Sequence, residues 1–222
     1  MPRPKAVLSW SSGKDSAWSL HVLRQRAEFE VVALVTTVTE AFDRVSMHAV
    51  RRELLRAQAE RAGLPLWEVS IPSPCSNAEY EERMRALVQR TAQSGVSHMA
   101  FGDLFLEDIR RYREKNLSGT GIEPLFPLWG IPTRELASEM LGGGLEAYVT
   151  CIDPRQAPAA LAGRRWDAAL IDELPPAADP CGENGEFHTC VVAGPMFDRP
   201  IATRPGEVVE RDGFVFADLA LA

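Results

Sequence analysis

The sequence predicts an α/β protein: a doubly wound parallel sheet with Rossmann-like connections, followed by a smaller, loop-rich α+β C-terminal region. Three observations support this fold class. Short apolar runs alternate with helical patterns, a small-residue loop follows the first apolar run, and glycine and proline interrupt the chain after about residue 118. Alternating strands and helices favour a parallel sheet with right-handed crossovers, and ligands bind such sheets beyond the carboxyl ends of the strands.

The first part of the chain contains four apolar runs that are short enough for buried parallel strands. They cover residues 6–10, 31–38, 66–71 and 98–102. Helical patterns lie between these runs. One extends from residue 17 to about residue 24, a second from an N-cap at Ser46 to a stop at Gly63, and a third from a capping box at Ser76 and Glu79 to Ser94. We expect these elements to form a first domain over residues 1–118.

The second part of the chain has shorter elements. We expect a helix near residues 133–141, a strand near residues 145–152, and a terminal strand pair joined by a turn at Asp212-Gly213, a sequence that suits tight hairpins. The segment 174–179, rich in proline and alanine, is expected to be a surface connection. These elements predict a smaller α+β domain over residues 119–222, which would supply substrate-binding or closing segments.

The loop Ser11-Ser12-Gly13-Lys14-Asp15-Ser16 joins the first strand to the first helix. Unpaired backbone N–H groups and the positive end of the helix dipole meet there, so the sequence predicts a phosphate site. Lys14, expected on the solvent side, adds a positive charge. Asp15 would repel a phosphate unless a divalent cation lies between them, which favours a metal–nucleotide complex. A Walker loop is excluded, because Leu8 and Asp15 stand where that motif needs Gly and Ser or Thr. An ordinary polar turn is the alternative.

This loop resembles Ser-Gly-Gly-Lys-Asp-Ser, the signature of the pyrophosphatase-loop enzymes, which have a HUP-type fold and split ATP between its α and β phosphates. The chain keeps five of the six residues and has Ser12 for a glycine, a change that is tolerated where positive φ is not needed. Residues 181–189, with the sequence CGENGEFHT, and the segment Gly194-Pro195-Met196-Phe197 resemble the closing motif of the diphthine–ammonia ligase (diphthamide synthase, ATP-binding) family. The resemblance covers most of the chain and is weaker over residues 104–114.

The resemblance implies an ATP-dependent ligase with Mg²⁺ as a second cofactor. Such an enzyme adenylates a substrate carboxylate, releases pyrophosphate, and transfers the acyl group to ammonia or another amine. The residues expected to bind ATP are Ser11, Ser12, Gly13, Lys14, Asp15, Ser16, His48 and Gly102. The residues expected to help hold the metal are Asp15 and Asp103. His48 is assigned by resemblance to a Met-Phe-His segment of the family, and a surface histidine at a helix start is the alternative.

The residues expected in catalysis are Lys14, Glu183, Glu186 and His188. Lys14 would stabilise the departing pyrophosphate. The two glutamates would bind Mg²⁺, hold ammonium or take a proton from the amine, and the sequence does not assign one role to each. His188 is a candidate acid, base or phosphate contact. Arg110, Arg113 and Lys115 form a cationic stretch that suits a carboxylate or pyrophosphate, or that forms a solvated helix face.

Composition bounds the function further. The chain has 222 residues, 45% of them hydrophobic, which is enough for a sizeable core. A net charge of −7 argues against a broad nucleic-acid surface. No apolar stretch approaches the roughly 20 residues of a membrane span, and no signal pattern begins the chain, so a cytoplasmic protein is expected. The four cysteines show no C-x-x-C spacing, which predicts free thiols. The oligomeric state, a homodimer included, is left open.

The acceptor and two rival functions also stay open. Arginine outnumbers lysine by 21 to 3, a bias that favours a GC-rich bacterial genome. A bacterial source would lack diphthine on elongation factor 2, so another carboxylate or a small metabolite is an alternative acceptor. The first rival function is nucleobase modification with sulfur carried by Cys151 or Cys181. The second is a non-catalytic ATP sensor.

Overall fold

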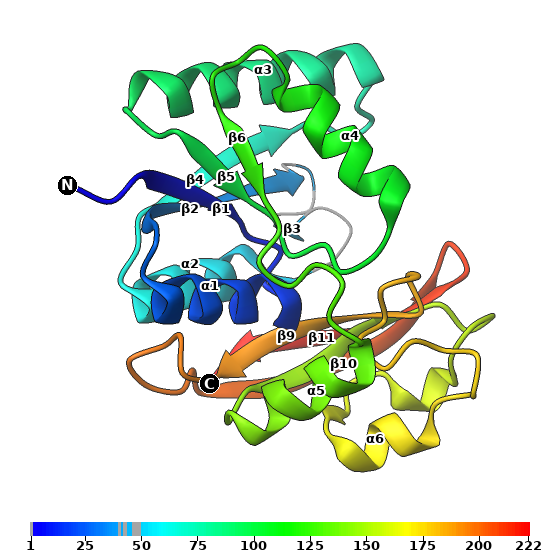
Figure 1. Ribbon diagram of the computed structural model, residues 1–222. Coiled ribbons are helices and arrows are strands. Elements are labelled where there is room, and N and C mark those ends of the chain that lie inside the picture. The colour runs from blue at the N-terminus through cyan, green and yellow to red at the C-terminus, as the bar shows by residue number, and fades with distance from the viewer. Residues whose placement is uncertain (1, 40, 42–43, 46–49) are drawn as a thin grey trace.

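The computed structural model describes residues 2–39, 41, 44–45 and 50–222. Two sheets are arranged one above the other, and helices α1 and α2 lie between them (Figure 1). The helices of the first half are α1 (Lys14–Arg26), α2 (Arg52–Ala62), α3 (Asn77–Gln93) and α4 (Glu107–Leu117). His48, expected in the nucleotide pocket, lies outside the described residues.

The first sheet is mostly parallel. Its strands are β1 (Lys5–Ser9), β2 (Glu30–Thr39), β3 (Arg44–Val45), β4 (Leu66–Ile71), β5 (His98–Ala100) and β6 (Glu123–Leu125). The parallel strands run in the order β4-β2-β1-β5-β6, and β3 is a short antiparallel addition beside the end of β2. Numbered by the parallel strands alone, this is the order 3-2-1-4-5 of doubly wound folds. The predicted α/β class is therefore confirmed, with β3 and β6 as the strands that the sequence analysis missed.

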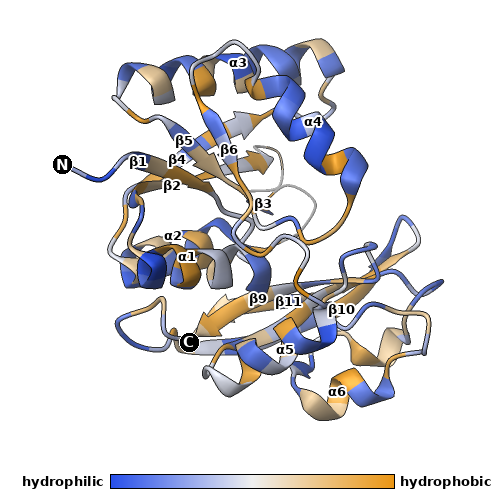
Figure 2. Cartoon of the chain, viewed as in Figure 1, coloured by the Kyte–Doolittle hydropathy of each residue, from blue (hydrophilic) through white to orange (hydrophobic). Residues whose placement is uncertain are grey.

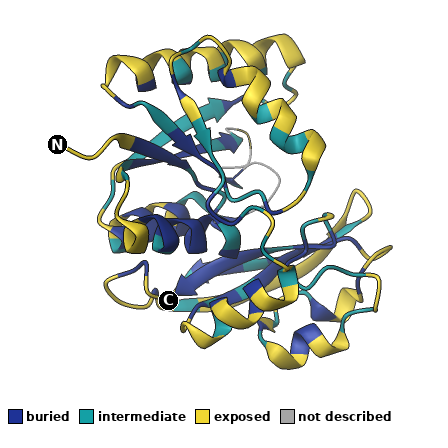
Figure 3. Cartoon of the chain, in the orientation of Figure 1, coloured by how far each residue is buried: buried dark blue, intermediate teal, exposed yellow. Residues whose placement is uncertain are grey.

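Side chains alternate between the two faces of this sheet, as strand geometry requires. Leu8 and Leu34 pack into the core on the side of α1 and α2, whereas Val7, Ala33 and Val35 pack into the core on the side of α3 and α4. Figure 2 shows hydrophobic residues along the strands and hydrophilic residues along the outer side of α4. Figure 3 shows the consequence for α1, which is largely buried because it is covered on both sides.

Several helix ends lie where the capping residues in the sequence predict them. The capping box is present: the Ser76 hydroxyl accepts from the Glu79 amide at 3.3 Å, and Glu79 accepts from the Ser76 amide at 3.0 Å. Gly63 ends α2 in the left-handed region, with φ of 65°. The expected N-cap of this helix at Ser46 was wrong, because α2 begins at Arg52 and has Arg51 as its N-cap.

The second sheet is antiparallel. Its strands are β7 (Glu146–Ile152), β8 (Arg165–Trp166), β9 (Phe187–Ala193), β10 (Thr203–Arg211) and β11 (Phe214–Leu221), with helices α5 (Thr133–Gly142) and α6 (Ala168–Glu173) beside them. The order is β10-β11-β7-β8, and β9 pairs with β7. Asp212 and Gly213 form the predicted turn with φ of 53° and 79°, both positive as a two-residue hairpin turn requires.

The two sheets share one core through α1 and α2. Gln58 of α2 is fully buried and ties them together: its amide donates to the carbonyls of Ser12 and Val191 at 3.1 and 2.7 Å, and its oxygen accepts from the Trp10 indole at 2.9 Å. Because β6 pairs with β5, the first sheet extends beyond residue 118. We propose a division of the chain within residues 126–132. Among the described residues, no helix combines the length and apolar character needed to cross a bilayer.

Candidate active site

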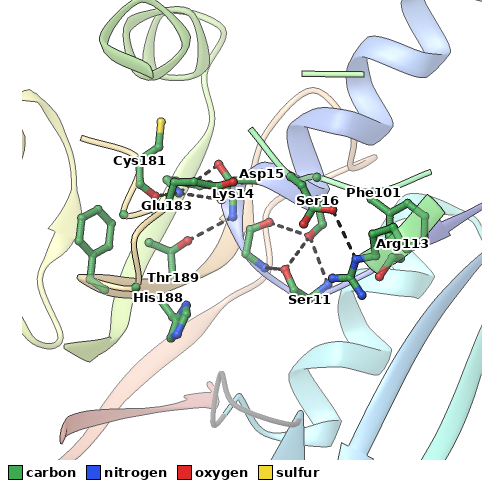
Figure 4. A pocket seen from close by; sticks show the side chains of 17 residues that line it. Ser11, Lys14, Asp15, Ser16, Phe101, Arg113, Cys181, Glu183, His188 and Thr189 are labelled. Carbon is green, nitrogen blue, oxygen red and sulfur yellow. Dashed lines mark hydrogen bonds and ion pairs between the residues drawn. The ribbon is translucent and has the colours of Figure 1, made fainter. Parts of the chain in front are cut away.

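A cavity of about 210 Å³ lies beyond the carboxyl end of β1, where the loop 11–16 meets the segment 181–189. Figure 4 shows the side chains that converge on it. From the first half of the chain it is lined by Ser9, Ser11, Gly13, Lys14, Asp15, Ser16, Phe101, Gly102, Asp103 and Arg113. From the second half it is lined by Cys181, Gly182, Glu183, Gly185, Phe187, His188 and Thr189. The structure thus brings together the two segments that the sequence analysis singled out.

The loop 11–16 presents the N-terminus of α1 to this cavity, with Gly13 as the N-cap. The hydroxyls of Ser11 and Ser16 lie 3.2 Å apart, and the Ser16 hydroxyl donates to the Gly13 carbonyl at 3.0 Å. A Cβ at Gly13 would lie 3.3 Å from the carbonyl oxygen of Thr189, so a side chain there would press on β9. The dipole and the N–H groups at the N-terminal end of α1 favour an anion in this cavity.

Ser12 departs from the expectation that its position needs no positive φ. Its φ is 71°, and its side chain is fully buried. The backbone is held there by β9, because the Ser12 carbonyl accepts from the amide of Val191 at 3.0 Å and from Gln58. The Ser12 hydroxyl is buried without a hydrogen-bond partner among the described residues. The serine therefore occupies a position that suits glycine.

Lys14 is buried rather than on the solvent side, with a side chain 3% exposed. Its ammonium donates to the Asp15 carboxylate at 2.8 Å and to the Cys181 carbonyl, and it lies 5.7 Å from the ring centres of Trp166 and Phe187. Burial acts to lower the pKa of Lys14, but the Asp15 carboxylate raises it above its usual value, so the lysine is charged. Lys14 thus connects the phosphate loop to the second domain, and the expectation that it lies on the solvent side was wrong.

Glu183 belongs to residues 181–189, the closing segment, and lines the cavity. It also contacts the first domain. Its Oε1 accepts from the amide of Leu104 at 2.7 Å. Burial raises the pKa of Glu183 to about 7, against the effect of that hydrogen bond. A carboxyl group with this pKa exchanges protons near neutral pH, as a general base requires.

Glu186 has a different environment. It is buried and does not line the cavity. Its Oε1 accepts from the amide of Asp179 at 2.8 Å and from the Asn184 side chain at 3.1 Å, whereas its Oε2 is buried without a hydrogen-bond partner among the described residues. The Glu186 carboxylate therefore holds the closing segment in position from outside the cavity, through its hydrogen bonds to Asp179 and Asn184. The two glutamates, which the sequence analysis could not distinguish, differ in what they touch.

His188 and Thr189 lie on β9, a strand that the sequence analysis did not predict. The Thr189 hydroxyl accepts from the Lys14 amide at 3.2 Å, so β9 caps the first turn of α1. Burial, with a smaller contribution from the Lys14 charge, lowers the pKa of His188 to about 4. The imidazole is therefore neutral at pH 7, where it can accept or donate a hydrogen bond but holds no proton to deliver as an acid.

Gly102 and Asp103 follow β5 at the same edge of the sheet. A Cβ at Gly102 would lie 3.0 Å from backbone atoms of Asp15 and Ser16, so a side chain there would press on the first turn of α1. The Asp103 carboxylate accepts from Arg113 at 3.4 Å, and the Arg113 guanidinium stacks on Phe101. Over the part of the chain that the structure describes, no group of three or more metal-binding side chains occurs. Asp15 and Asp103 nevertheless line one cavity, and two carboxylates plus phosphate oxygens is a usual donor set for Mg²⁺.

Asp179 is a site residue that the sequence analysis missed, because its segment was taken as a surface connection. One carboxylate oxygen accepts from the amides of Cys181 and Glu183 at 2.8 and 3.4 Å, and the other accepts from the Thr133 hydroxyl at 2.6 Å. Asp179 thus shapes the turn that carries Cys181 and Glu183. Its position before Pro180 and Cys181, directly ahead of the polar motif, was the only sequence signal for it.

The parallel sheet, with a small-residue loop and a helix N-terminus at the end of β1, defines a protein of the nucleotide-binding α/β class. The chain belongs to the diphthamide synthase family: the family's N-terminal domain matches residues 4–124 and its C-terminal domain matches residues 132–215. This family contains the diphthine–ammonia ligases, which are ATP-dependent enzymes. The family resemblance expected from the two motifs is confirmed.

The chain is distantly similar to several diphthine–ammonia ligases. The diphthine–ammonia ligase of Bos taurus is 24% identical over an alignment of 240 positions, which covers 95% of this chain and 86% of that protein. The diphthine–ammonia ligase of Schizosaccharomyces pombe is 28% identical over 90% of this chain and 36% of its own length. Among solved structures, the U34-tRNA thiolase NcsA from Methanococcus maripaludis with its [4Fe-4S] cluster superposes with a TM-score of 0.40 and 17% identity, over 64% of this chain and 58% of that one. This low structural similarity supports no statement about function.

Proposed function

We propose that the protein is an ATP-dependent, AMP-forming carbon–nitrogen ligase. A carboxylate of the acceptor attacks the α phosphorus of ATP, pyrophosphate leaves, and ammonia or another amine then displaces AMP to form an amide. One observation carries this proposal: the two motifs of the family, which are 169 residues apart from Gly13 to Gly182, line the same cavity beside the α1 N-terminus.

The chain's own groups suit the first half of this reaction. The N-terminus of α1 and the hydroxyls of Ser11 and Ser16 would bind the phosphates, and Lys14 would stabilise the departing pyrophosphate after exchanging one of its present partners. Asp15 and Asp103 would hold Mg²⁺ together with the phosphates. When bound, the metal would neutralise phosphate charge.

The closing segment suits the second half. Glu183 would take a proton from the attacking amine, since its pKa of about 7 lets it act as a base near neutral pH. His188 would contact the nucleotide or acceptor as a neutral hydrogen-bonding group. Glu186 and Asp179 would hold the segment in place through backbone amides. Closure of the cavity by this segment would keep water from the acyl-adenylate.

The rival based on sulfur transfer is disfavoured by the cysteines. All four are free, as predicted, and Cys151 and Cys181 are buried. Burial raises the pKa of the Cys151 thiol to about 11 and raises that of Cys181 further. A sulfur carrier needs an accessible thiolate, which neither residue provides.

Nucleotide products distinguish a ligase from an ATP sensor. The purified chain, incubated with ATP, Mg²⁺ and fractions of a metabolite extract, should form AMP and pyrophosphate in equal amounts, with at least one fraction as the stimulating acceptor. Chromatography of the nucleotides is the measurement, and boiled protein is the control. Formation of ADP in stoichiometric yield would overturn the proposal, and ATP binding without cleavage in any fraction would favour the sensor.

A further inference from the structure

A second cavity of about 800 Å³ adjoins the first and lies beyond the carboxyl end of β2. Thr36 and Thr37 of β2 line it, and Ile71 lines it from the end of β4. In doubly wound sheets, ligands lie beyond the carboxyl ends of the strands. A nucleotide whose phosphates lie at the loop 11–16 would therefore place its nucleoside in this larger cavity.

The two cavities share four lining residues, which are Ser9, Ser11, Phe101 and Arg113. These residues mark the boundary between the cavities. The phosphate chain of a nucleotide is bonded to the nucleoside through the α phosphate, so that phosphate would lie at the boundary. Arg113 is the charged member of the four. Lys14, in contrast, lines the smaller cavity only, where the β and γ phosphates would lie.

Arg113 reaches the boundary from α4 and is oriented by two contacts. Its Nε donates to the Asp103 carboxylate at 3.4 Å, and its guanidinium stacks on the Phe101 ring with 4.9 Å to the ring centre. Figure 4 shows Arg113 beside Phe101. The terminal nitrogens carry the other N–H donors of the guanidinium fork. A fork with a fixed plane matches two oxygens of one phosphate.

Burial makes this arginine more effective toward an anion than a surface arginine. The Arg113 side chain is 29% exposed and that of Asp103 is 17% exposed. Solvent and salt screen a partly buried charge less than an exposed one. A purely structural role is the alternative, because the same two contacts would also hold Phe101 and Asp103 in place. The two roles differ in which part of a nucleotide depends on Arg113.

We propose that the boundary of the two cavities is the α-phosphate position of the nucleotide and that Arg113 binds this phosphate, whereas Lys14 acts on the β and γ phosphates. The identity of the nucleotide as ATP rests on the proposed function. In that reaction a bond forms between the acceptor carboxylate oxygen and the α phosphorus. The bond from that phosphorus to the bridging oxygen breaks, and this oxygen leaves with pyrophosphate. Arg113 would neutralise the charge on the α-phosphate oxygens during this exchange.

AMP, adenosine and pyrophosphate test the assignment, because each carries a different part of ATP. Calorimetry at fixed ionic strength measures the binding of each compound to the wild type and to Arg113→Gln. AMP binding should weaken at least about tenfold, as expected for loss of a charge-assisted contact. Binding of adenosine and of pyrophosphate should change less than about twofold, as for a change at an independent site. Arg113→Lys keeps the charge without the fork and should retain part of the AMP affinity.

The matched control is Arg111→Gln. Arg111 lies on the same helix, its side chain is 76% exposed, and it lines neither cavity. The control makes the same change in net charge as Arg113→Gln. We expect it to change AMP binding less than about twofold, because solvent and salt screen an exposed charge.

Several outcomes would overturn the inference. Equal weakening of AMP binding in Arg113→Gln and Arg111→Gln would show a general effect of charge. A loss of adenosine binding as large as that of AMP would show that Arg113 only shapes the cavity. A larger loss of pyrophosphate binding would place Arg113 at the β and γ phosphates, and a wild type that does not bind AMP would have no such site.

The nucleotide products keep this inference apart from the proposed function. Stoichiometric formation of ADP would overturn the ligase and leave the contact between Arg113 and the α phosphate standing. Formation of AMP and pyrophosphate, with unchanged AMP binding in Arg113→Gln, would overturn the assignment of Arg113 alone.

Discussion

The loop after β1 and the segment before β9 meet at one cavity, but they are built by different means. The loop 11–16 is defined by backbone: a helix N-terminus, a glycine N-cap and close contacts with β9. The segment 181–186 is defined by side chains, because Asp179 and Glu186 accept from its amides or support it from behind. The first has its anion-favouring geometry wherever the fold forms. The second positions Glu183 only if the hydrogen bonds accepted by Asp179 and Glu186 are intact.

Lys14 connects the two segments. It belongs to the loop 11–16, yet its ammonium donates to the Cys181 carbonyl of the closing segment as well as to Asp15. A single buried cation therefore connects the two halves of the chain and, in the proposed reaction, would also provide the charge that stabilises pyrophosphate. Variants that separate these tasks test the comparison most strongly.

Lys14→Ala should have the largest effect. We expect turnover to fall at least about a hundredfold, as for loss of a group that stabilises developing charge. We also expect the free energy of unfolding to fall by about 2 kcal/mol, below the usual cost of breaking a fully buried ion pair, because Asp15 is 25% exposed. Calorimetry with ATP and urea denaturation measure the two effects.

Asp15→Asn is the matched control for Lys14→Ala, because it removes the partner charge but keeps the lysine and its contact with Cys181. The double variant should regain part of the stability that Lys14→Ala loses, since no unpaired carboxylate is left. Unchanged ATP affinity in Lys14→Ala would remove the lysine from the phosphate site, and unchanged stability would contradict its role between the domains.

Glu183→Gln and Glu186→Gln form a matched pair that distinguishes a cavity residue from a brace. Glu183→Gln should lower turnover by about a hundredfold with little change in ATP affinity, because it removes the proposed base. Glu186→Gln should lower turnover about fivefold, the equivalent of one hydrogen bond worth about 1 kcal/mol. Steady-state kinetics with the acceptor found in the extract screen gives both values, and equal losses would show that the distinction between the two glutamates is wrong.

The pH dependence of the wild type and of Glu183→Gln tests whether Glu183 is the base. The folded pKa of Glu183, about 7, lies above its unfolded value near 4.5. Turnover of the wild type should therefore rise with pH through about 7 as the base loses its proton, and this rise should be absent in Glu183→Gln. The raised pKa also means that ionising Glu183 costs stability, so the variant should gain relative to the wild type as pH increases from 4.5 to 7. A wild-type profile that is flat across this range would exclude Glu183 as the base.

Local patterns predicted much of the fold and the position of the first loop. The capping box at Ser76 and the turn at Asp212-Gly213 depend on a few neighbouring residues, so their sequences were sufficient. What the sequence did not reveal depends on β9, which docks on the loop 11–16 from about 175 residues away. The burial of Lys14 and the positive φ of Ser12 both follow from that contact, and no pattern within either segment indicates it.

Ser12→Gly should have the smallest effect. It tests the contact between β9 and the loop 11–16 at Ser12, where the backbone is strained. A serine with φ of 71° carries backbone strain of about 1 kcal/mol, and its buried, unpaired hydroxyl costs about 1 kcal/mol more. Glycine removes both costs but gains about 1 kcal/mol of entropy in the unfolded chain. We therefore expect a net gain of about 1 kcal/mol in the free energy of unfolding, or roughly 2–4 °C in Tm.

Two controls divide the Ser12→Gly gain into its parts. Ser12→Ala removes the hydroxyl and keeps the left-handed backbone. Ala27→Gly relieves the same kind of backbone at the exposed end of α1, where φ is 52° and no hydroxyl is buried. If backbone strain and the buried hydroxyl contribute separately, the gain from Ser12→Gly should exceed that from Ala27→Gly by about the gain seen in Ser12→Ala. If Ser12→Gly is instead less stable than the wild type, the hydroxyl has a partner in solution, and the serine is then the residue that suits this loop.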